Sequence, residues 1–194
     1  YQNHACMEPL NATALYTPDS CKVWVGTQNG EAALAAAAEA SGLPIAKCDV
    51  EKLLLGGGFG RRGFTDNVRQ AVLIAKEMPG TPVKLQWSRE EDMLHGKYHP
   101  IMQAKLTGAL DKSGNLTALQ IRLSGQSIMA SVFPQALDKG KDPFTFQGFW
   151  PSGEQSFEYS IPNLMIDHAM RNTHVPPGFW RGVNINQNAI FLEC

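Results

Sequence analysis

The sequence has no excess of charge of either sign. Its 17 Lys and Arg residues are balanced by 18 Asp and Glu residues, a formal net charge of -1 over 194 residues. The basic residues are scattered, so the surface that a nucleic-acid-binding protein needs is not indicated. No apolar run approaches the ~20 residues that span a bilayer, and no signal peptide is recognisable. We expect no nucleic-acid partner and no membrane span in this chain.

The sequence also lacks a recognisable metal-binding pattern. Its four cysteines are widely spaced and form no C-x-x-C pair, which argues against a structural zinc site or an iron–sulfur cluster in this chain. Four of the five histidines, at positions 95, 99, 168 and 174, have no carboxylate at a metal-ligand spacing. We therefore expect no metal ligands among its side chains.

The first half alternates strand and helix signals. β-forming residues predict strands at 22–27, 48–55 and 83–87. Residues 32–40 are almost entirely alanine, which predicts a helix with Asn29 as its cap and Gly42 as its stop. A second helix is expected to start with Asp66 as its cap, because apolar residues then recur at helical spacing.

The second half has longer extended runs. Strands are predicted at 101–110, 116–124 and 164–170, a hairpin turn at 111–114, a long loop at 132–156 and a helix from about position 187. Four aromatic residues of the loop, at 144, 146, 149 and 150, either line a substrate channel or pack the loop down. We predict an α+β fold, with a mixed sheet and packed helices in residues 1–95 and a β-rich segment in 96–194.

Four glycines stand close together at the end of an apolar run, in Gly56-Gly57-Gly58-Phe59-Gly60, which we call the glycine loop. Glycine has no Cβ and tolerates positive φ, so the peptide N–H groups of such a loop can converge on an anionic cofactor. A second glycine-rich turn, residues 178–182, also follows a strand and precedes a helix, as does the segment 27–29. Such loops tend to meet at one edge of a sheet, so all three are expected to face one ligand.

Other interpretations of the glycine loop are open. Residues 58–63 satisfy G-x-G-x-x-G between a strand and a helix, the pattern of a dinucleotide site, and Arg89 stands where a residue selecting the 2′-phosphate of NADP would lie. Against this, Arg62 occupies the tightly packed end of the turn. The loop is otherwise a tight turn without a ligand, in a cofactor-free α+β binding module.

Taken together, the segments resemble the molybdenum hydroxylases, the xanthine dehydrogenase and aldehyde oxidase family, and most closely the molybdopterin-binding subunit of the bacterial isoquinoline 1-oxidoreductase type. The matching segments lie in the family's order, at residues 4–14, 26–29, 56–62, 89–94, 99–100, 159–163, 177–182 and 193–194. The resemblance implies that residues 1–95 and 96–194 are both parts of one larger molybdopterin-binding domain. It leaves the compartment open between bacterial cytoplasm and periplasm.

The resemblance also implies roles for individual residues. Gln28 matches the glutamine whose amide approaches an oxo ligand of molybdenum, and it is the one catalytic residue implied in this chain. The residues matching the loop that contacts the pterin dithiolene are Gly57, Gly58, Phe59 and Gly60. The residues matching a second loop whose backbone passes close to the cofactor are Trp180, Arg181 and Gly182.

The family hydroxylates N-heteroaromatic compounds or aldehydes with water as the oxygen source, and its electrons leave for iron–sulfur clusters on a partner subunit or domain. The resemblance implies molybdopterin, as the cytosine dinucleotide, with molybdenum. The catalytic glutamate of the family is expected outside this chain, so the chain is expected to be a piece of a longer protein and inactive alone.

Two departures from the family bear on the substrate. Gly63 replaces the substrate-binding glutamate of xanthine-oxidising members, which argues against purines, and Val183 replaces their substrate-stacking aromatic ring. For Arg61 and Arg62 we expect roles in the folded scaffold or in a pterin-side contact.

Overall fold

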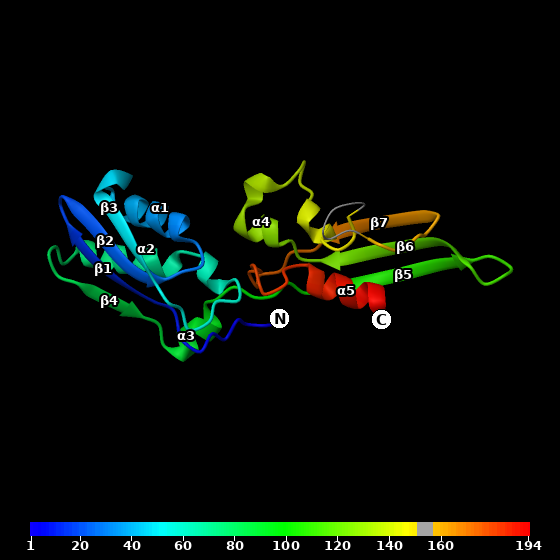
Figure 1. Cartoon of the computed structure of the whole chain (residues 1–194), viewed down its shortest axis with the longest axis horizontal. Helices are drawn as coiled ribbons and strands as arrows, with labels where there is room; N and C mark the ends of the chain where they lie inside the picture. The colour runs from blue at the N-terminus through cyan, green and yellow to red at the C-terminus, as the bar shows by residue number, and fades with distance from the viewer. Residues whose placement is uncertain (151–156) are drawn as a thin grey trace. The chain divides into compact units, whose positions relative to one another are not determined.

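The computed structural model describes residues 1–150 and 157–194, which form two compact units. One unit is Asn3–Lys97, and the other combines Tyr1–Gln2 with Tyr98–Cys194. Each unit has its own sheet with helices beside it (Figure 1). This mixed architecture, with a β-rich second half, confirms the predicted α+β fold.

A mixed four-stranded sheet forms the first unit. Its strands are β1 (Asn11–Thr17), β2 (Ser20–Gly26), β3 (Cys48–Leu53) and β4 (Val83–Gln86). They lie in the order β3-β2-β1-β4, with β2 and β3 parallel and β1 antiparallel to both β2 and β4. The strands at β2, β3 and β4 confirm the predictions, whereas β1 was missed.

Three helices accompany this sheet: α1 (Gly30–Ser41), α2 (Asp66–Lys76) and the short α3 (Arg89–Leu94). The Asn29 Oδ1 accepts a hydrogen bond from Ala32 N–H at 3.0 Å, and Gly42 ends α1 with φ 76°, so both predicted boundaries of α1 are confirmed. The prediction that Asp66 caps α2 is wrong. Asp66 is the first helical residue, and its carboxylate is bound by Arg61 instead.

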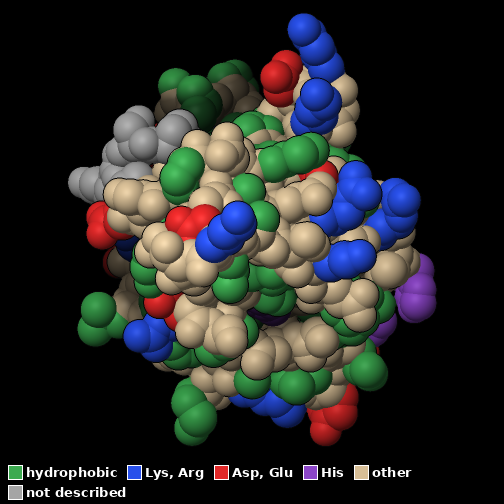
Figure 2. Space-filling view, turned by 90° about the vertical axis from the view of Figure 1, so that its right-hand side faces the viewer, with side chains coloured by type: hydrophobic (Ala, Val, Ile, Leu, Met, Phe, Trp, Pro, Cys, Tyr) green, Lys and Arg blue, Asp and Glu red, His purple; other side chains and the backbone are tan. Residues whose placement is uncertain are grey.

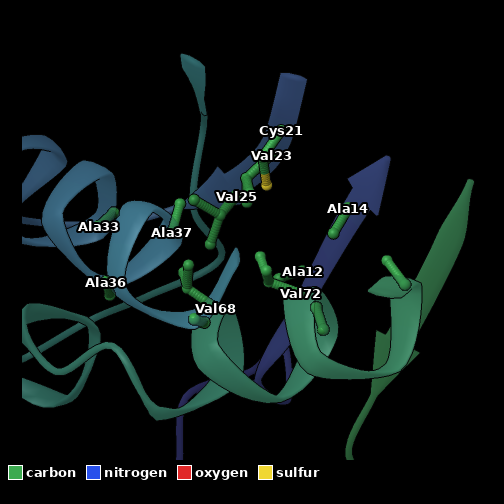
Figure 3. Packing of buried hydrophobic residues seen from close by; sticks show 13 residues of the cluster. Ala12, Ala14, Cys21, Val23, Val25, Ala33, Ala36, Ala37, Val68 and Val72 are labelled. Carbon is green, nitrogen blue, oxygen red and sulfur yellow. The ribbon is translucent and has the colours of Figure 1, made fainter. Parts of the chain in front are cut away.

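Small side chains fill the core between this sheet and its two long helices. Figure 3 shows alanines of β1 and α1 packed among valines of β2 and α2. The fully buried members are Ala12, Ala14, Cys21, Val23, Val25, Ala33, Ala36, Ala37, Val68, Ala71, Val72 and Ala75. Because alanine adds so little bulk, α1 and α2 approach the sheet closely, which fixes where the loops at the strand ends lie.

The second unit is built on a three-stranded sheet in the order β5-β6-β7. Its strands are β5 (Met102–Leu110), β6 (Leu116–Gly125) and β7 (Asn163–Met170), and its helices are α4 (Ile128–Val132) and α5 (Ile185–Glu193). β5 and β6 form the predicted antiparallel hairpin, and β7 is parallel to β6. The predicted long loop contains the end of α4 and 3-10 turns at Pro134–Ala136 and Pro143–Phe146, and residues 151–156 lie outside the described part.

Larger side chains form the core of this second unit. Ile121, Leu123 and Phe149 are buried there, and half-buried residues pack against them from the loop and from α5, namely Phe146, Phe157, Phe191 and Leu192. Phe146 and Phe149 therefore pack the long loop onto the sheet.

One face of the molecule carries apolar side chains scattered among charged side chains of both signs (Figure 2). Among the described residues, no helix combines the length and apolar character that crossing a membrane requires.

Candidate cofactor site

Gln28 and the glycine loop meet at one edge of the first sheet. Gln28 follows β2 and the loop follows β3, and these strands are parallel neighbours, so their carboxyl ends lie at the same edge. The Gln28 Oε1 accepts hydrogen bonds from Gly60 N–H at 3.0 Å and from Arg62 N–H at 3.2 Å. The predicted meeting of these two segments is confirmed.

These bonds fix the orientation of the Gln28 amide. Its oxygen is occupied by two peptide N–H groups, so its nitrogen faces away from the loop backbone. Within the described residues, Gln28 Nε2 donates to no protein acceptor, and the residue is exposed. Gln28 thus presents two N–H donors beside the glycine loop.

The backbone of the glycine loop is left-handed at three positions. Gly57 has φ 98°, Phe59 φ 53° and Gly60 φ 104°. Positive φ is ordinary for glycine but uncommon for phenylalanine. Phe59 is also 43% exposed, although its side chain is large and apolar. A strained backbone with an exposed ring is typical of a site whose geometry serves a ligand.

Three successive carbonyl groups of the loop accept hydrogen bonds from the protein scaffold. They are Gly56 O from Glu8 N–H at 3.1 Å, Gly57 O from Arg62 Nε at 2.7 Å, and Gly58 O from Arg61 N–H at 2.8 Å. In a trans peptide, a carbonyl and the following N–H point in opposite directions. The N–H groups of Gly57, Gly58 and Phe59 therefore face away from these scaffold donors, and none has a hydrogen-bond partner among the described residues.

Cys6 supports the same side of the loop. Its thiol donates a weak hydrogen bond to Gly58 O, at 3.5 Å between sulfur and oxygen. Burial raises the pKa of this thiol, although the nearby Arg62 charge opposes the rise, so the group stays a neutral donor. The scaffold contacts to Gly57 and Gly58 thus bind their carbonyls and leave the N–H groups of Gly57, Gly58 and Phe59 available for an acceptor.

Arg61 and Arg62 both serve the folded scaffold. Arg61 is 2% exposed, binds Asp66 through both terminal nitrogens and lies 5.5 Å from the centre of the Trp87 ring. Arg62 is 1% exposed, and its guanidinium contacts backbone carbonyls and the Glu8 carboxylate. Neither guanidinium is a surface charge.

A side chain at position 58 would clash with Gln28. A Cβ there would lie 2.5 Å from Gln28 Oε1, which is closer than real contacts allow. The reason for glycine at this position is therefore contact with Gln28, and φ is not positive there. A Cβ at Gly63, in contrast, would meet no atom within 4 Å.

The open space at Gly63 argues against the dinucleotide interpretation. In that motif the third glycine lets a helix pack closely on a strand, but nothing approaches Gly63, and α2 begins only at Asp66. Arg89, the candidate for a 2′-phosphate contact, instead binds Asp92 and the carbonyls of Cys6 and Met7. These residues do not form the expected dinucleotide site.

The second loop lies in the second compact unit and also has a strained backbone. Gly182 has φ 87°, and Val183 has φ 52°, a rare conformation for a β-branched residue. Val183 N–H donates to Trp180 O at 2.6 Å, and Asn186 Nδ2 donates to Arg181 O. A tight turn thus precedes α5, as the sequence predicted.

Buried amide side chains hold this turn against the long loop. Asn184 Nδ2 donates to Phe144 O at 2.8 Å, and Gln187 Nε2 donates to Asn184 Oδ1 at 2.9 Å. Asn188 Nδ2 donates to the carbonyls of Thr145 and Gln147, at 2.8 and 2.7 Å. Sequence analysis missed this ladder. The recurrence of amides through residues 184–188 was its one signal.

The geometry of the first loop suits an acceptor-rich, anionic ligand. Three peptide N–H groups and the Gln28 amide are donors without protein partners in the described structure, while the opposite side of the loop is bound by scaffold residues. Oxygen and sulfur acceptors of an anionic cofactor fit a donor set of this kind. The fold and the site together define a cofactor-binding domain.

Comparisons with known proteins identify the family of this cofactor-binding domain. The model of the molybdopterin cofactor-binding domain family matches residues 1–194, and the chain belongs to that family. Isoquinoline 1-oxidoreductase subunit beta from Brevundimonas diminuta is 30% identical over 94% of this chain and 23% of that protein. A membrane-bound aldehyde dehydrogenase from Gluconacetobacter polyoxogenes, named for pyrroloquinoline quinone, is 28% identical over 98% of this chain and 25% of its own length.

The solved structures agree on the fold. Quinoline 2-oxidoreductase from Pseudomonas putida 86 superposes with a TM-score of 0.71 at 20% identity, covering 94% of this chain and 23% of that chain. The chain spans about a quarter of the length of these relatives.

Proposed function

We propose that this chain is the cofactor-facing segment of a molybdopterin-dependent hydroxylase that oxidises an N-heteroaromatic compound or an aldehyde. One observation carries the proposal: the glycine loop and Gln28 present a set of unpartnered donors, held from behind by bonds to the loop carbonyls. Membership of the molybdopterin-binding family identifies the cofactor class that such donors would bind.

Each candidate residue has a stated role in this proposal. Gln28 donates through Nε2 to an oxygen acceptor of the molybdenum centre, since its Oε1 is already occupied. The peptide N–H groups of Gly57, Gly58 and Phe59 bind the cofactor, with Gly60 anchoring Gln28. For Trp180, Arg181 and Gly182 of the second loop, a backbone contact with the cofactor is proposed on the family resemblance alone.

The cofactor supplies oxidative hydroxylation when it is bound, with the oxygen taken from water. The chain's own contribution is to bind and orient it. The bonds to Gly60 and Arg62 hold the Gln28 amide in place beforehand, so it would donate to an acceptor atom of the bound cofactor without reorganisation.

Further parts of the proposal follow from the relatives. We infer a partner subunit, because a relative is named as a subunit. The cytosine dinucleotide form of molybdopterin, and an iron–sulfur subunit or domain as electron acceptor, are proposed on the family resemblance. The substrate classes are taken from relatives named for isoquinoline and for an aldehyde. Gly63 has no side chain at the position where xanthine-oxidising members carry a substrate-binding glutamate, which argues against purine substrates.

Analysis of bound cofactor in the full-length protein tests this function. Purified from its natural host, the protein should contain molybdenum close to one atom per chain, release a fluorescent pterin with acid, and release CMP on hydrolysis of the cofactor. Release of pyrroloquinoline quinone without molybdenum, or micromolar binding of NADP, would overturn the proposal. Release of a nucleotide other than CMP would correct only the cytosine assignment.

A further inference from the structure

One buried residue contacts both candidate cofactor segments of the first unit. The Arg62 guanidinium donates to four backbone carbonyls, Gly57 at 2.7 Å, Gly26 at 3.3 Å, Glu8 at 2.6 Å and Pro9 at 3.4 Å. Its backbone N–H donates to Gln28 Oε1, and its carbonyl accepts from Gln28 N–H at 2.9 Å and from Thr27 Oγ1 at 3.0 Å. Gln28 and the glycine loop are thus tied to the same residue.

We propose that Arg62 is a positioning residue that sets which way the peptides of the glycine loop face. A guanidinium has donors only, so it binds a carbonyl and has no acceptor to offer an N–H. If the peptide between Gly57 and Gly58 turned over, its N–H would be directed at the buried cation and its carbonyl at the cofactor side. The turned conformation is therefore disfavoured for two reasons: the hydrogen bond from Arg62 to Gly57 O is lost, and the peptide N–H would face a group that cannot accept a hydrogen bond.

Glu8 completes the arrangement. Its carboxylate lies 3.1 Å from Arg62 Nη2, accepts from Gly56 N–H at 2.7 Å and accepts from Asn11 Nδ2 at 2.7 Å. The buried cation thus has a counter-charge that also holds the first residue of the loop. A buried charge is costly without a partner, so Arg62 and Glu8 depend on each other and hold the loop together. Which ligand the loop binds rests on the proposed function.

A pair of buried arginines offers a matched test. Arg62→Met removes the donor to the Gly57 carbonyl of the loop, whereas Arg61→Met removes a neighbouring buried cation whose side chain binds Asp66 instead. In cofactor-free full-length protein, we expect amide exchange at Gly56 and Gly60 to be about tenfold faster in Arg62→Met than in Arg61→Met, after normalisation to exchange in β1. Equal exchange in the two variants would overturn the role.

Cofactor loading is the second readout. When both variants are produced in a host that makes molybdopterin, Arg62→Met should contain about tenfold less bound molybdopterin than Arg61→Met. The comparison is made under conditions in which the two variants have the same melting temperature. Loading that follows stability alone in both variants would make Arg62 merely structural. If Arg62→Met does not fold, Arg62→Lys replaces it, since lysine keeps the charge but cannot reach the separate carbonyls. Exchange at Gly60 no faster than in Arg61→Met would then overturn the role.

These readouts separate this inference from the proposed function. Absence of molybdopterin from the unchanged protein would contradict the function, while the exchange comparison, which needs no cofactor, would still decide the role of Arg62.

Discussion

The two compact units support their candidate loops by different means. The glycine loop rests on a buried guanidinium and a carboxylate, Arg62 and Glu8. The second loop rests on neutral amides: Gln187 donates to Asn184, and Asn184 and Asn188 donate to backbone carbonyls. The charged support controls which way individual peptides face, whereas the neutral support ties a turn and a helix to a long loop.

The cores differ in the same way. In the first unit, alanine and valine let helices lie close to the sheet, so there is little room for change at the loop. In the second unit, larger side chains such as Ile121, Leu123 and Phe149 form the core, and buried polar groups carry much of the specific structure. We expect the first unit to be sensitive to added volume and the second to lost hydrogen bonds.

The largest expected effect is on the amide ladder. Asn188→Leu leaves the carbonyls of Thr145 and Gln147 without their donor in a buried place, which should lower the free energy of unfolding by about 2–4 kcal/mol. Urea unfolding measures it. Asn163→Leu is the control, because its amide makes one similar bond at an exposed site and should cost under about 1 kcal/mol. Equal losses would show that the buried amide ladder contributes no more to stability than one exposed amide bond.

Next in size is the effect of Gln28→Ala on turnover in the full-length enzyme. Losing one hydrogen bond to a charged or polarised acceptor should raise the activation barrier by about 1.5–3 kcal/mol. The fractional loss of turnover should therefore exceed the fractional loss of bound molybdenum. Steady-state kinetics and metal analysis measure the two. Asn29→Ala, which removes the α1 cap beside it, should cost about 1 kcal/mol of stability and leave turnover per molybdenum unchanged. Unchanged turnover in Gln28→Ala would contradict its role.

Added volume in the first unit comes third. Gly58→Val forces Gln28 to move and should lower the free energy of unfolding by about 1–3 kcal/mol, giving folded protein with little bound cofactor. Thermal unfolding and molybdenum content measure this. Gly63→Ala is the matched control, because its Cβ would meet no atom within 4 Å. Full cofactor loading in Gly58→Val would show that the loop is only a turn.

The smallest expected effect is a difference in acid sensitivity between the units. Burial lowers the pKa of both His99 and His168 below 6.5, although backbone carbonyls oppose the shift at each and the Asp142 charge opposes it at His168. The unfolded chain then binds more protons than the folded one, so this stability is complete above pH 6.5 and falls as pH drops toward the folded pKa values. Both groups lie in the second unit.

Glu8 makes the stability of the first unit depend on pH in a lower pH range than the histidines of the second unit. Burial alone would raise the pKa of its carboxyl, but the Asn11 and Gly56 donors and the Arg62 charge lower it below 4.5. Stability from Glu8 is therefore present above pH 4.5 and is lost as pH falls through the folded value. After correction for the intrinsic pH dependence of exchange, amide protection should fall in the second unit first as the pH drops from 7 to 5. A His99→Gln, His168→Gln double variant should abolish that difference, and persistence of the difference would contradict this assignment.

Several features were determined by the sequence itself because their causes are local. Helix α1 was predicted with both ends, since alanine propensity, an Asn cap and a glycine stop all act within a few residues. The β5–β6 hairpin followed from alternation and its turn. The glycine loop was recognisable because only glycine accepts such backbone angles readily, and Phe59 is the exception that marks the strain.

Other features were decided only by the tertiary structure. β1 carries a weak signal because its inward residues are alanines, and it forms a strand by pairing with β2 and β4 on either side. The capping role expected of Asp66 was lost to Arg61, a competitor that becomes available only when that guanidinium is buried. Gln28 and Arg62 are 34 positions apart, so the bonds that orient the amide arise when β2 and β3 pair and bring their ends together. Residue type is local information, whereas burial and the direction of a peptide depend on partners distant in the chain.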